Sequence, residues 1–485
     1  MPEEVPPDHQ GLAPRRRFGW PFPARTMPGR RLPVRLLDGQ PEAAPRANLR
    51  QLLALAWPSA LEQLQRTFVG LADIYIVSQL GAAALTGVGL SGQALTLGLV
   101  ALSAVGVGAT VLIGLAIGAS RGEAANRVLG QAIFVAIAVG LVGGGVGFWT
   151  VSPLLRLLGA EPGVATLGTI WIHVAAPAFL LNAILLVGCS ALRGAGDTRT
   201  PLLIVLGANV LDLGLSWGLT NGHLGLPKLG VLGNAIANDA GQIAGGLIVL
   251  WLLSRGIDGL RLRWQYLWPD RNQLLRLVKL GTPAGVEMIL LQAVFAALAV
   301  ALARLSAAAF AANQISSWVA ALAYLPGSGV SIAVTTLVSQ AIGPQRPDEA
   351  RAIVGMAWWL TLGLMTVLGV ALYFLALPIM QLFSRDPDVV QGGRDAIRMA
   401  AFIQPAMAAA YVYSGALTGA GDTRTTTIIS VACTWSLRLT IAYLAAIVWH
   451  WGVVGVWLGI GADYAGRAVW GWLRFRSNKW QGLLI

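Results

Sequence analysis

The chain has 485 residues, of which 56% are hydrophobic and only 12% are charged, and its mean hydropathy is +0.67. A soluble protein has to present a polar exterior to water, so this composition excludes an ordinary soluble domain. The formal net charge of +12 does not indicate a nucleic-acid-binding protein, because the basic residues lie in an N-terminal arm and in alternate loops rather than in one patch.

Residues 1–50 are rich in Pro and Arg and contain no sustained apolar segment. They do not resemble a secretory signal peptide, and we interpret them as a disordered, basic cytoplasmic arm. Five arginines of the arm either contact anionic lipid or only satisfy the excess of positive charge on the cytoplasmic side. These are Arg15, Arg16, Arg17, Arg30 and Arg31.

Long apolar segments follow the arm along the rest of the chain. Residues 132–149, 202–217 and 358–380 are almost free of charge, and a helix needs roughly 20 mostly apolar residues to cross a bilayer. The pattern predicts about twelve such helices. We therefore expect an all-α polytopic membrane protein.

The first predicted membrane helix carries Glu62, Arg66 and Asp73. Ionisable groups inside a membrane are costly and usually functional. Glu62 and Asp73 are separated by close to three helical turns, so they share one face about 16 Å apart along the axis. Arg66 lies one turn after Glu62 and is placed to pair with it, whereas Asp73 has no basic neighbour within a turn.

The segment GAGDTRT occupies residues 194–200, after the fourth predicted helix. Its two glycines can end that helix through a left-handed turn, Asp197 or a neighbouring threonine can cap the next helix, and Pro201 suits the first turn. A phosphate-binding loop would normally follow a strand and contain a lysine, and both are missing. A tight cytoplasmic hairpin is the favoured interpretation.

The fifth and sixth predicted helices place more polar groups near the depth of Asp73. Asn209 and Asp212 lie on the fifth helix, and Asn238 and Asp239 lie on the sixth. We expect Asp73, Asn209, Asp212 and Asn238 to meet and to exchange a proton, or to hold Na⁺ through oxygen ligands, because burial and a second carboxylate favour protonation. The competing structural interpretation is that Asp212 or Asp239 only caps a broken helix.

The GAGDTRT segment returns at residues 419–425, an offset of 225 residues. The same offset places Pro58 on Pro283 and Glu62 on Glu287, and it aligns residues 77–91 with 302–316 and 115–125 with 340–350. The chain is therefore predicted to be two repeats of about six helices. Leu298 falls opposite Asp73, so the acid cluster is expected in the first repeat alone.

An even number of helices in each repeat returns the chain to its starting side. The two lobes should therefore share one orientation and be related by a pseudo-twofold axis along the membrane normal. We expect an N-terminal lobe at 51–254, a cytoplasmic linker at 255–275, a C-terminal lobe at 276–475 and a cytoplasmic tail at 476–485. Arginine-rich loops place both termini in the cytoplasm, and we expect a monomer in the plasma (inner) membrane.

Two prolines and three charged residues each allow more than one interpretation. Pro58 and Pro283 lie inside the first and seventh helices, where each permits either a hinge or a static kink. Glu62 and Glu287 follow the prolines by one turn and are favoured as structural partners of the backbone or of a neighbouring helix. Arg438 lies inside the eleventh helix, where it needs a partner or binds an anion.

No enzyme active site or cofactor site is predicted. Cys189 and Cys433 lie in apolar segments, which excludes a disulfide framework, and the four histidines have no metal-ligand spacing. There is no nucleophile-elbow serine and no GxxxxGK[ST] motif for ATP-driven transport.

Several spaced motifs resemble the multidrug and toxic compound extrusion (MATE) family. They are P58-x3-E62-x10-D73 followed by QLG and AALTGVGLSG, the RGAGDTRTP hairpin, and the repeated AIG-x-(Q/S)R loop, and the resemblance covers about residues 50–475. It implies a two-lobed, twelve-helix antiporter that exports small organic cations or amphipathic compounds in exchange for H⁺ or Na⁺, without any other cofactor.

Within that family the chain looks closest to the DinF-type branch. The resemblance assigns the first-lobe ion site, including any bound Na⁺, to Asp73, Asn209, Asp212 and Asn238. The chain departs from the branch in two ways, since Asn209 and Asp212 are three residues apart rather than four and Asn238 stands where Thr is usual. The acids that NorM-type members carry deeper in the seventh helix and in the tenth are absent.

Two other functions remain open from the sequence. A flippase for a lipid-linked precursor, from a related superfamily, would need a cationic central cavity, and only Arg438 suggests one. A channel or membrane scaffold without coupled turnover would show flux that is independent of Asp73.

Overall fold

The computed structural model describes residues 48–157, 159–223 and 225–481. The predicted arm therefore lies outside the described residues up to residue 47, as do residues 482–485 of the predicted tail. The first lobe contains α1 (Leu49–Ser78), α2 (Ala82–Gly118), α3 (Gly122–Leu157), α4 (Pro162–Ala195), α5 (Arg199–Asn221) and α6 (Val231–Arg255). The second lobe contains α7 (Arg271–Leu305), α8 (Ala307–Ile342), α9 (Pro347–Phe383), α10 (Pro387–Gly419), α11 (Thr423–Ala432), α12 (Leu439–Tyr443) and α13 (Gly452–Arg476).

The eleventh crossing differs from the others because it contains π-helical turns. The turn η2 (Cys433–Arg438) joins α11 to α12, and the turn η3 (Leu444–Val448) follows α12. All four pieces form one continuous apolar segment from residue 423 to 448. The matching helix of the first lobe, α5, has no π turn, so this irregularity belongs to the second lobe.

Nine helical segments of the described chain are long and apolar enough to cross a membrane. Helices α1, α10 and α13 are outside these nine, and they contain buried polar groups such as Glu62, Gln404 and Asp463. With these three the bundle has twelve helical crossings and no strand among the residues that the structure describes. The predicted all-α, two-lobed polytopic membrane protein is confirmed.

Hydrogen bonds between helices repeat with the offset of 225 residues. The Ser91 hydroxyl donates to the carbonyl of Gly168 at 2.9 Å, and Ser316 donates to that of Gly393 at 3.2 Å. In the same way Thr110 donates to the carbonyl of Ser190 at 2.8 Å. Its counterpart, Thr335, donates to the carbonyl of Gly415 at 3.1 Å. The duplication seen in the sequence therefore extends to individual contacts in space.

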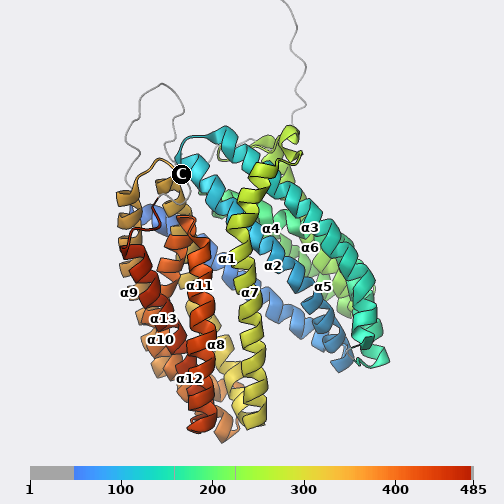
Figure 1. The fold of residues 1–485 in the computed structure, drawn as a ribbon. Coiled ribbons are helices and arrows are strands. Elements are labelled where there is room, and N and C mark those ends of the chain that lie inside the picture. Colours follow the sequence, from blue (N-terminus) through green and yellow to red (C-terminus); the bar gives the residue numbers. More distant parts are fainter. Residues whose placement is uncertain (1–47, 158, 224, 482–485) are drawn as a thin grey trace, which may run out of the picture. The chain divides into compact units, whose positions relative to one another are not determined.

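The two lobes meet through two equivalent helix pairs. Helix α1 packs on α8, and α7 packs on α2. A Cβ atom at Gly281 of α7 would lie 2.3 Å from the Ala104 carbonyl oxygen, and one at Gly329 of α8 would lie 2.7 Å from that of Ala56. The backbones are thus in direct contact. Figure 1 shows α3 to α6 on one side of α2 and α7, and α8 to α13 on the other.

Both GAGDTRT copies end a helix, but their aspartates differ. Gly196 (φ 96°) and Gly421 (φ 82°) take the left-handed conformation. Asp197 accepts from the backbone N–H groups of Arg199 and Thr200, both at 3.0 Å, and so caps α5 as predicted. Asp422 is the N-cap residue of α11 but makes no capping hydrogen bond with its side chain, which instead accepts from Arg474 Nε at 2.7 Å. We call this end of the bundle the hairpin end.

Candidate functional site

The acids of the first lobe gather between α1, α5 and α6. Asp212 on α5 is 3% exposed, and its Oδ2 accepts from Asn238 Nδ2 of α6 at 3.4 Å. Asp73 on α1 is half-buried and acts electrostatically on Asp212, as does Asp239. The structure thus brings together Asp73, Asp212 and Asn238 of the predicted set.

A chain of buried donors leads to Asp73. Trp171 Nε1 donates to Asn234 Oδ1 at 3.1 Å, and Asn234 Nδ2 donates to Ser216 Oγ at 3.0 Å. An indole N–H can only donate, so it fixes the orientation of the Asn234 amide. Ser216 and Asn234 both lie against the Asp73 carboxylate. Sequence reasoning missed all three partners, because single Trp, Ser and Asn residues in apolar helices carry no motif.

Two carboxylate oxygens of this cluster have no hydrogen-bond partner among the described residues. They are Asp73 Oδ1 and Asp212 Oδ1, and both are buried. A buried polar atom without a partner is rare and costs about 1–3 kcal/mol. A proton, or a monovalent cation held by oxygen ligands, would satisfy both atoms. No group of three or more His, Cys, Asp or Glu side chains in the described chain is placed to hold a metal ion.

Asn209, the fourth residue of the predicted set, lies beside other polar residues of the first lobe. It lines a small cavity beside Arg66, Asn182 and Gln242, and its Nδ2 has no partner among the described residues. The expectation that Asn209 meets Asp73 and Asp212 stays a prediction. A residue three positions before Asp212 lies about 60° away around the helix, which turns its side chain towards a different neighbour.

Glu62 belongs to a buried ion-pair network that joins α1 to α4. It is 4% exposed, and both carboxylate oxygens accept from Arg193 Nη1, at 3.1 and 3.0 Å. Arg66 Nη2 donates to the same carboxylate at 3.1 Å, which confirms the predicted pair. Arg193 Nη2 also donates to Ser190 at 2.9 Å. These contacts give Glu62 the structural role that was favoured from the sequence.

The second lobe contains a buried charge cluster that the sequence analysis did not identify. Asp463 of α13 is 0% exposed and pairs with Arg438 Nη2 at 2.7 Å and with Arg467 Nε at 2.7 Å. Arg467 Nη1 also lies 3.9 Å from Glu287, which accepts from Thr427 at 3.4 Å. The expectation that acids gather in the first lobe alone is therefore wrong, and Arg438 has the partner that it needed.

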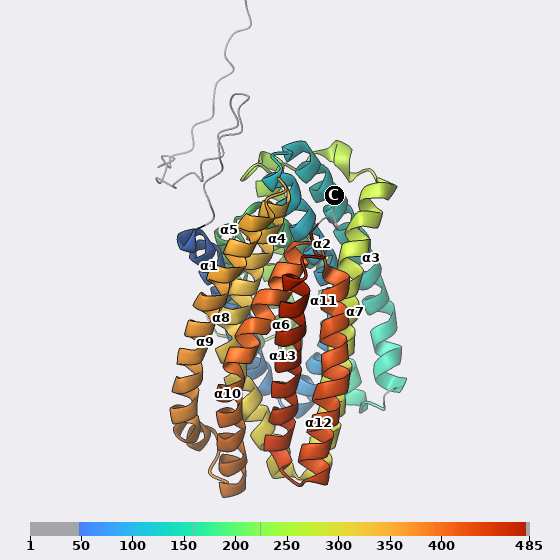
Figure 2. The ribbon, with the colours of Figure 1, turned by 60° about the vertical axis from the view of Figure 1, so that its left-hand side comes forward.

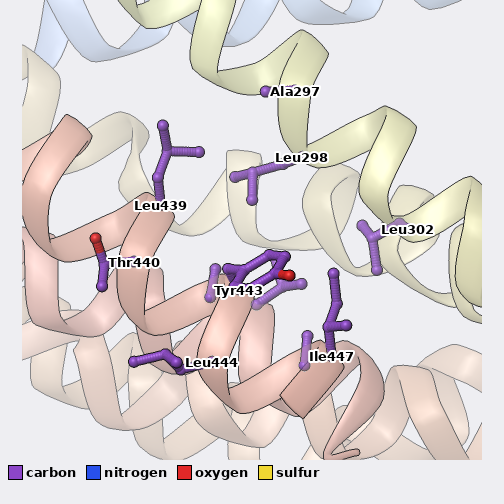
Figure 3. Close-up of a pocket in the computed structure, with 11 residues that line it drawn as sticks. Ala297, Leu298, Leu302, Leu439, Thr440, Tyr443, Leu444 and Ile447 are labelled. Carbon is purple, nitrogen blue, oxygen red and sulfur yellow. The ribbon is translucent and has the colours of Figure 1, made fainter.

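An apolar cavity of about 420 Å³ lies between α7 and the α12–η3 region. Figure 3 shows Leu298 and Leu302 of α7 facing Leu439 and Ile447, with the ring of Tyr443 between them. Figure 2 shows α7 beside α11 and α12. Leu298 is the repeat counterpart of Asp73. The second lobe thus has an apolar cavity where the first lobe has its unpartnered acid.

The family model MatE matches residues 58–217 and 283–444, the two repeats. The chain belongs to the MatE family. It is 27% identical over 437 residues to a probable multidrug resistance protein NorM of Thermotoga maritima, covering 89% of this chain and 93% of that protein. It is 26% identical over 441 residues to the multidrug resistance protein PmpM of Pseudomonas aeruginosa, covering 87% of this chain and 90% of that protein.

Solved MATE structures share the fold. A crystal structure of MATE in complex with MaL6 has a TM-score of 0.82 at 21% identity and covers 89% of this chain and 97% of that one. The bent form of the Vibrio cholerae MATE transporter VcmN also has a TM-score of 0.82 at 21% identity, and the match covers 89% of this chain and 98% of that one. The protein is therefore a multi-pass membrane transporter of the MATE family. Its place in the DinF-type branch stays a prediction.

Proposed function

We propose that the protein is a secondary active antiporter that exports small organic cations or amphipathic compounds in exchange for H⁺ or Na⁺. The observation that supports this most directly is the pair of unpartnered, buried oxygens on Asp73 and Asp212 inside membrane-spanning helices. Such a site gains most from a bound cation, and an empty site is costly. Binding and release of a cation at this site therefore change the relative stability of the conformations of the first lobe.

The class of exported compound follows from the relatives and from the cavity. Relatives that cover most of the chain carry the name multidrug resistance protein. The cavity of about 420 Å³ is lined by leucines, alanines and one tyrosine ring, which is the size and character of a small-molecule site. Apolar contacts and one aromatic face suit flat organic compounds and set few requirements on shape.

The hairpin end faces the cytoplasm in this proposal. Arginines are concentrated in the loops and adjoining helix ends on that side, as the positive-inside rule requires for the cytoplasmic side. They include Arg121, Arg127, Arg199, Arg346 and Arg351. Both termini then lie in the cytoplasm, and the transporter is placed in the plasma (inner) membrane.

Alternating access is the motion that we propose for the transport cycle. Each lobe is held together by its own repeated hydrogen bonds, and the lobes contact each other through small residues on α1, α2, α7 and α8. Parallel-repeat transporters exchange access by rocking one such body against the other around the bound substrate. Pro58 of α1 and Pro283 of α7 lie two residues after Ala56 and Gly281, which form the close interlobe contacts, and are the proposed hinges.

Two other functions receive less support from the structure. A lipid-linked-precursor flippase would need the free positive charge of Arg438, and that charge is paired with Asp463. A channel or scaffold would not need an unpartnered buried acid pair.

The proposal is tested with the purified protein in liposomes that contain a fluorescent organic cation. Export is measured under a pH gradient and under a Na⁺ gradient, for the wild type and for Asp73→Asn. We expect one gradient to drive export and the substitution to abolish it. Export by the wild type under neither gradient would reject the antiporter, and driven export that survives Asp73→Asn would move coupling away from Asp73. The matched control is Glu62→Gln, which changes a second acid on the same helix.

A further inference from the structure

The charge cluster of the second lobe shares the position of Asn238 with the first-lobe site, whereas Asp73 and Asp212 correspond to Leu298 and Leu437. With the offset of 225 residues, Asp463 corresponds to Asn238 and Arg467 to Gln242. Glu287 corresponds to Glu62 by the same rule. Where the first lobe has two neutral amides one turn apart on α6, the second lobe has an acid and an arginine one turn apart on α13.

The correspondence holds in space as well as in sequence. A Cβ atom at Gly241 of α6 would meet Ala208 and Asp212 of α5. A Cβ atom at Gly466 of α13 would meet Cys433 and Leu437, which are the residues 225 positions later. The two helix pairs are therefore in the same register at the level of the site.

The guanidinium of Arg467 is surrounded by oxygen atoms. Its Nε lies 2.7 Å from Asp463 Oδ1 and its Nη1 lies 3.1 Å from Ser430 Oγ. Its Nη2 is in close contact with the Thr434 hydroxyl, and Glu287 Oε1 lies 3.9 Å away. Carboxylate and hydroxyl oxygens are the ligands that a hard monovalent cation takes in proteins. The guanidinium thus occupies an oxygen-lined position for a cation.

The charge of the cluster balances only when Arg467 is present. Two carboxylates, Asp463 and Glu287, face two guanidinium groups, Arg438 and Arg467. The ring of Tyr464 lies 5.7 Å from the carbon of each guanidinium. Removal of one guanidinium leaves an uncompensated negative charge in a buried, hydroxyl-lined site, which is strongly unfavourable until another cation enters.

We infer that Arg467 is a built-in cation that permanently occupies an oxygen-lined cation position in the second lobe, one turn from the counterpart of Asn238. The second lobe then binds no exchangeable H⁺ or Na⁺ in the native protein. The coupling ion of the proposed antiporter binds in the first lobe alone, at Asp73. This last step rests on the proposed function, whereas occupancy by Arg467 can be measured without any transport.

The test measures cation-dependent stability of the purified protein in the Asp73→Asn background, which removes one of the two unpartnered first-lobe acids. Melting midpoints are recorded in Na⁺, Li⁺ and choline, and at several pH values. Arg467→Gln installs the residue of the first lobe and should create a saturable upward shift with Na⁺, Li⁺ or H⁺ that the Arg467 protein lacks. Arg467→Lys retains the charge and should show no such shift.

Two further variants distinguish cation binding at a defined site from an effect of net charge alone. Asp463→Asn combined with Arg467→Gln reproduces both first-lobe residues and should remove the new cation dependence. Arg438→Leu, which also matches the first lobe at Leu213, leaves the same net charge but keeps Arg467 in place. It should lower stability without cation dependence.

The inference is overturned if Arg467→Gln folds and its midpoint does not respond to any of the small cations, or if Arg438→Leu responds equally. If Arg467→Gln folds only in Na⁺ and not in choline, the inference is supported. If Arg467→Gln folds in neither salt and regains folding only when Asp463→Asn is added, the inference is overturned. A failure of the proposed function is seen separately, as the absence of gradient-driven export by the wild type.

Discussion

Replacement of Glu62 by Gln should reduce stability strongly while leaving ion coupling intact. Glu62 is buried and accepts three charge-assisted hydrogen bonds, one from Arg66 and two from Arg193. Removing one partner of a buried ion pair costs about 3–5 kcal/mol, because the remaining charge stays buried without compensation. The Gln amide oxygen can still accept one of the three bonds, so we expect a loss near the lower limit, about 3 kcal/mol.

The chain offers two matched controls for this prediction. Arg66 is 42% exposed in its side chain, so Arg66→Ala should cost less than about 1 kcal/mol. Glu287, the repeat counterpart of Glu62, has a longer ion pair, 3.9 Å to Arg467, and its other partners are the neutral hydroxyls of Thr427, at 3.4 Å, and Ser430. Glu287→Gln should therefore destabilise the protein less than Glu62→Gln does.

The assay is thermal unfolding of the three variants in one detergent, followed by fluorescence of the monodisperse fraction. The expected order of melting midpoints is wild type and Arg66→Ala highest, Glu287→Gln next, and Glu62→Gln lowest. Folded Glu62→Gln should still export dye under the same gradient as the wild type. Equal losses for Arg66→Ala and Glu62→Gln would refute the reasoning from burial, and a loss of gradient dependence in Glu62→Gln would refute its structural role.

Four further outcomes are expected. Asn234→Leu breaks the chain of hydrogen bonds from Trp171 to Ser216 and leaves buried polar groups without partners, so it should destabilise the protein by about 1–3 kcal/mol in thermal unfolding. Gly118→Leu should destabilise the contact of α2 with α8 by about 1–3 kcal/mol in thermal unfolding, because a Cβ there would lie 2.0 Å from a backbone oxygen of α8. Leu298→Trp fills the apolar cavity and should raise the KM for export while gradient dependence is retained. Partial burial and the neighbouring Asp197 carboxylate raise the pKa of Asp258, in the linker, to about 6, so the folded state disfavours the charged acid above that pH. Asp258→Asn should therefore increase stability at pH 7 and leave it unchanged at pH 4, as measured by unfolding at the two pH values. The gain should be less than about 1 kcal/mol, because the residue is exposed to solvent.

Much of the fold could be predicted from the sequence because it is determined by two strong signals. Apolar length gives the membrane helices, and identical spaced residues such as Pro58 and Pro283 give the repeat. The π turns in the eleventh crossing could not be predicted in the same way. They change the hydrogen-bond register of a few residues without changing the apolar pattern.

The candidate site was only partly predictable. Asp73, Asp212 and Asn238 were found because acids and amides are rare in membrane helices. Their partners Trp171, Ser216 and Asn234 depend on side-chain orientation between helices, which no local pattern specifies. Asp463 and Arg467 were missed although a signal existed, since the repeat offset aligns ANDAGQ of α6 with ADYAGR of α13. Applying the offset to the last helix would have identified both.

The reciprocal contacts of α1 with α8 and of α7 with α2 have the form of an isologous dimer interface, in which each partner contributes the same surface. Here the two partners are joined in one polypeptide. In a dimer of identical chains every substitution occurs twice, so an arginine placed in one ion site would occupy both sites and abolish exchange. Covalent fusion removes that constraint. One half can retain its acids for exchange while the other becomes a fixed support of the same shape, and Arg467 has no arginine opposite it in the first lobe.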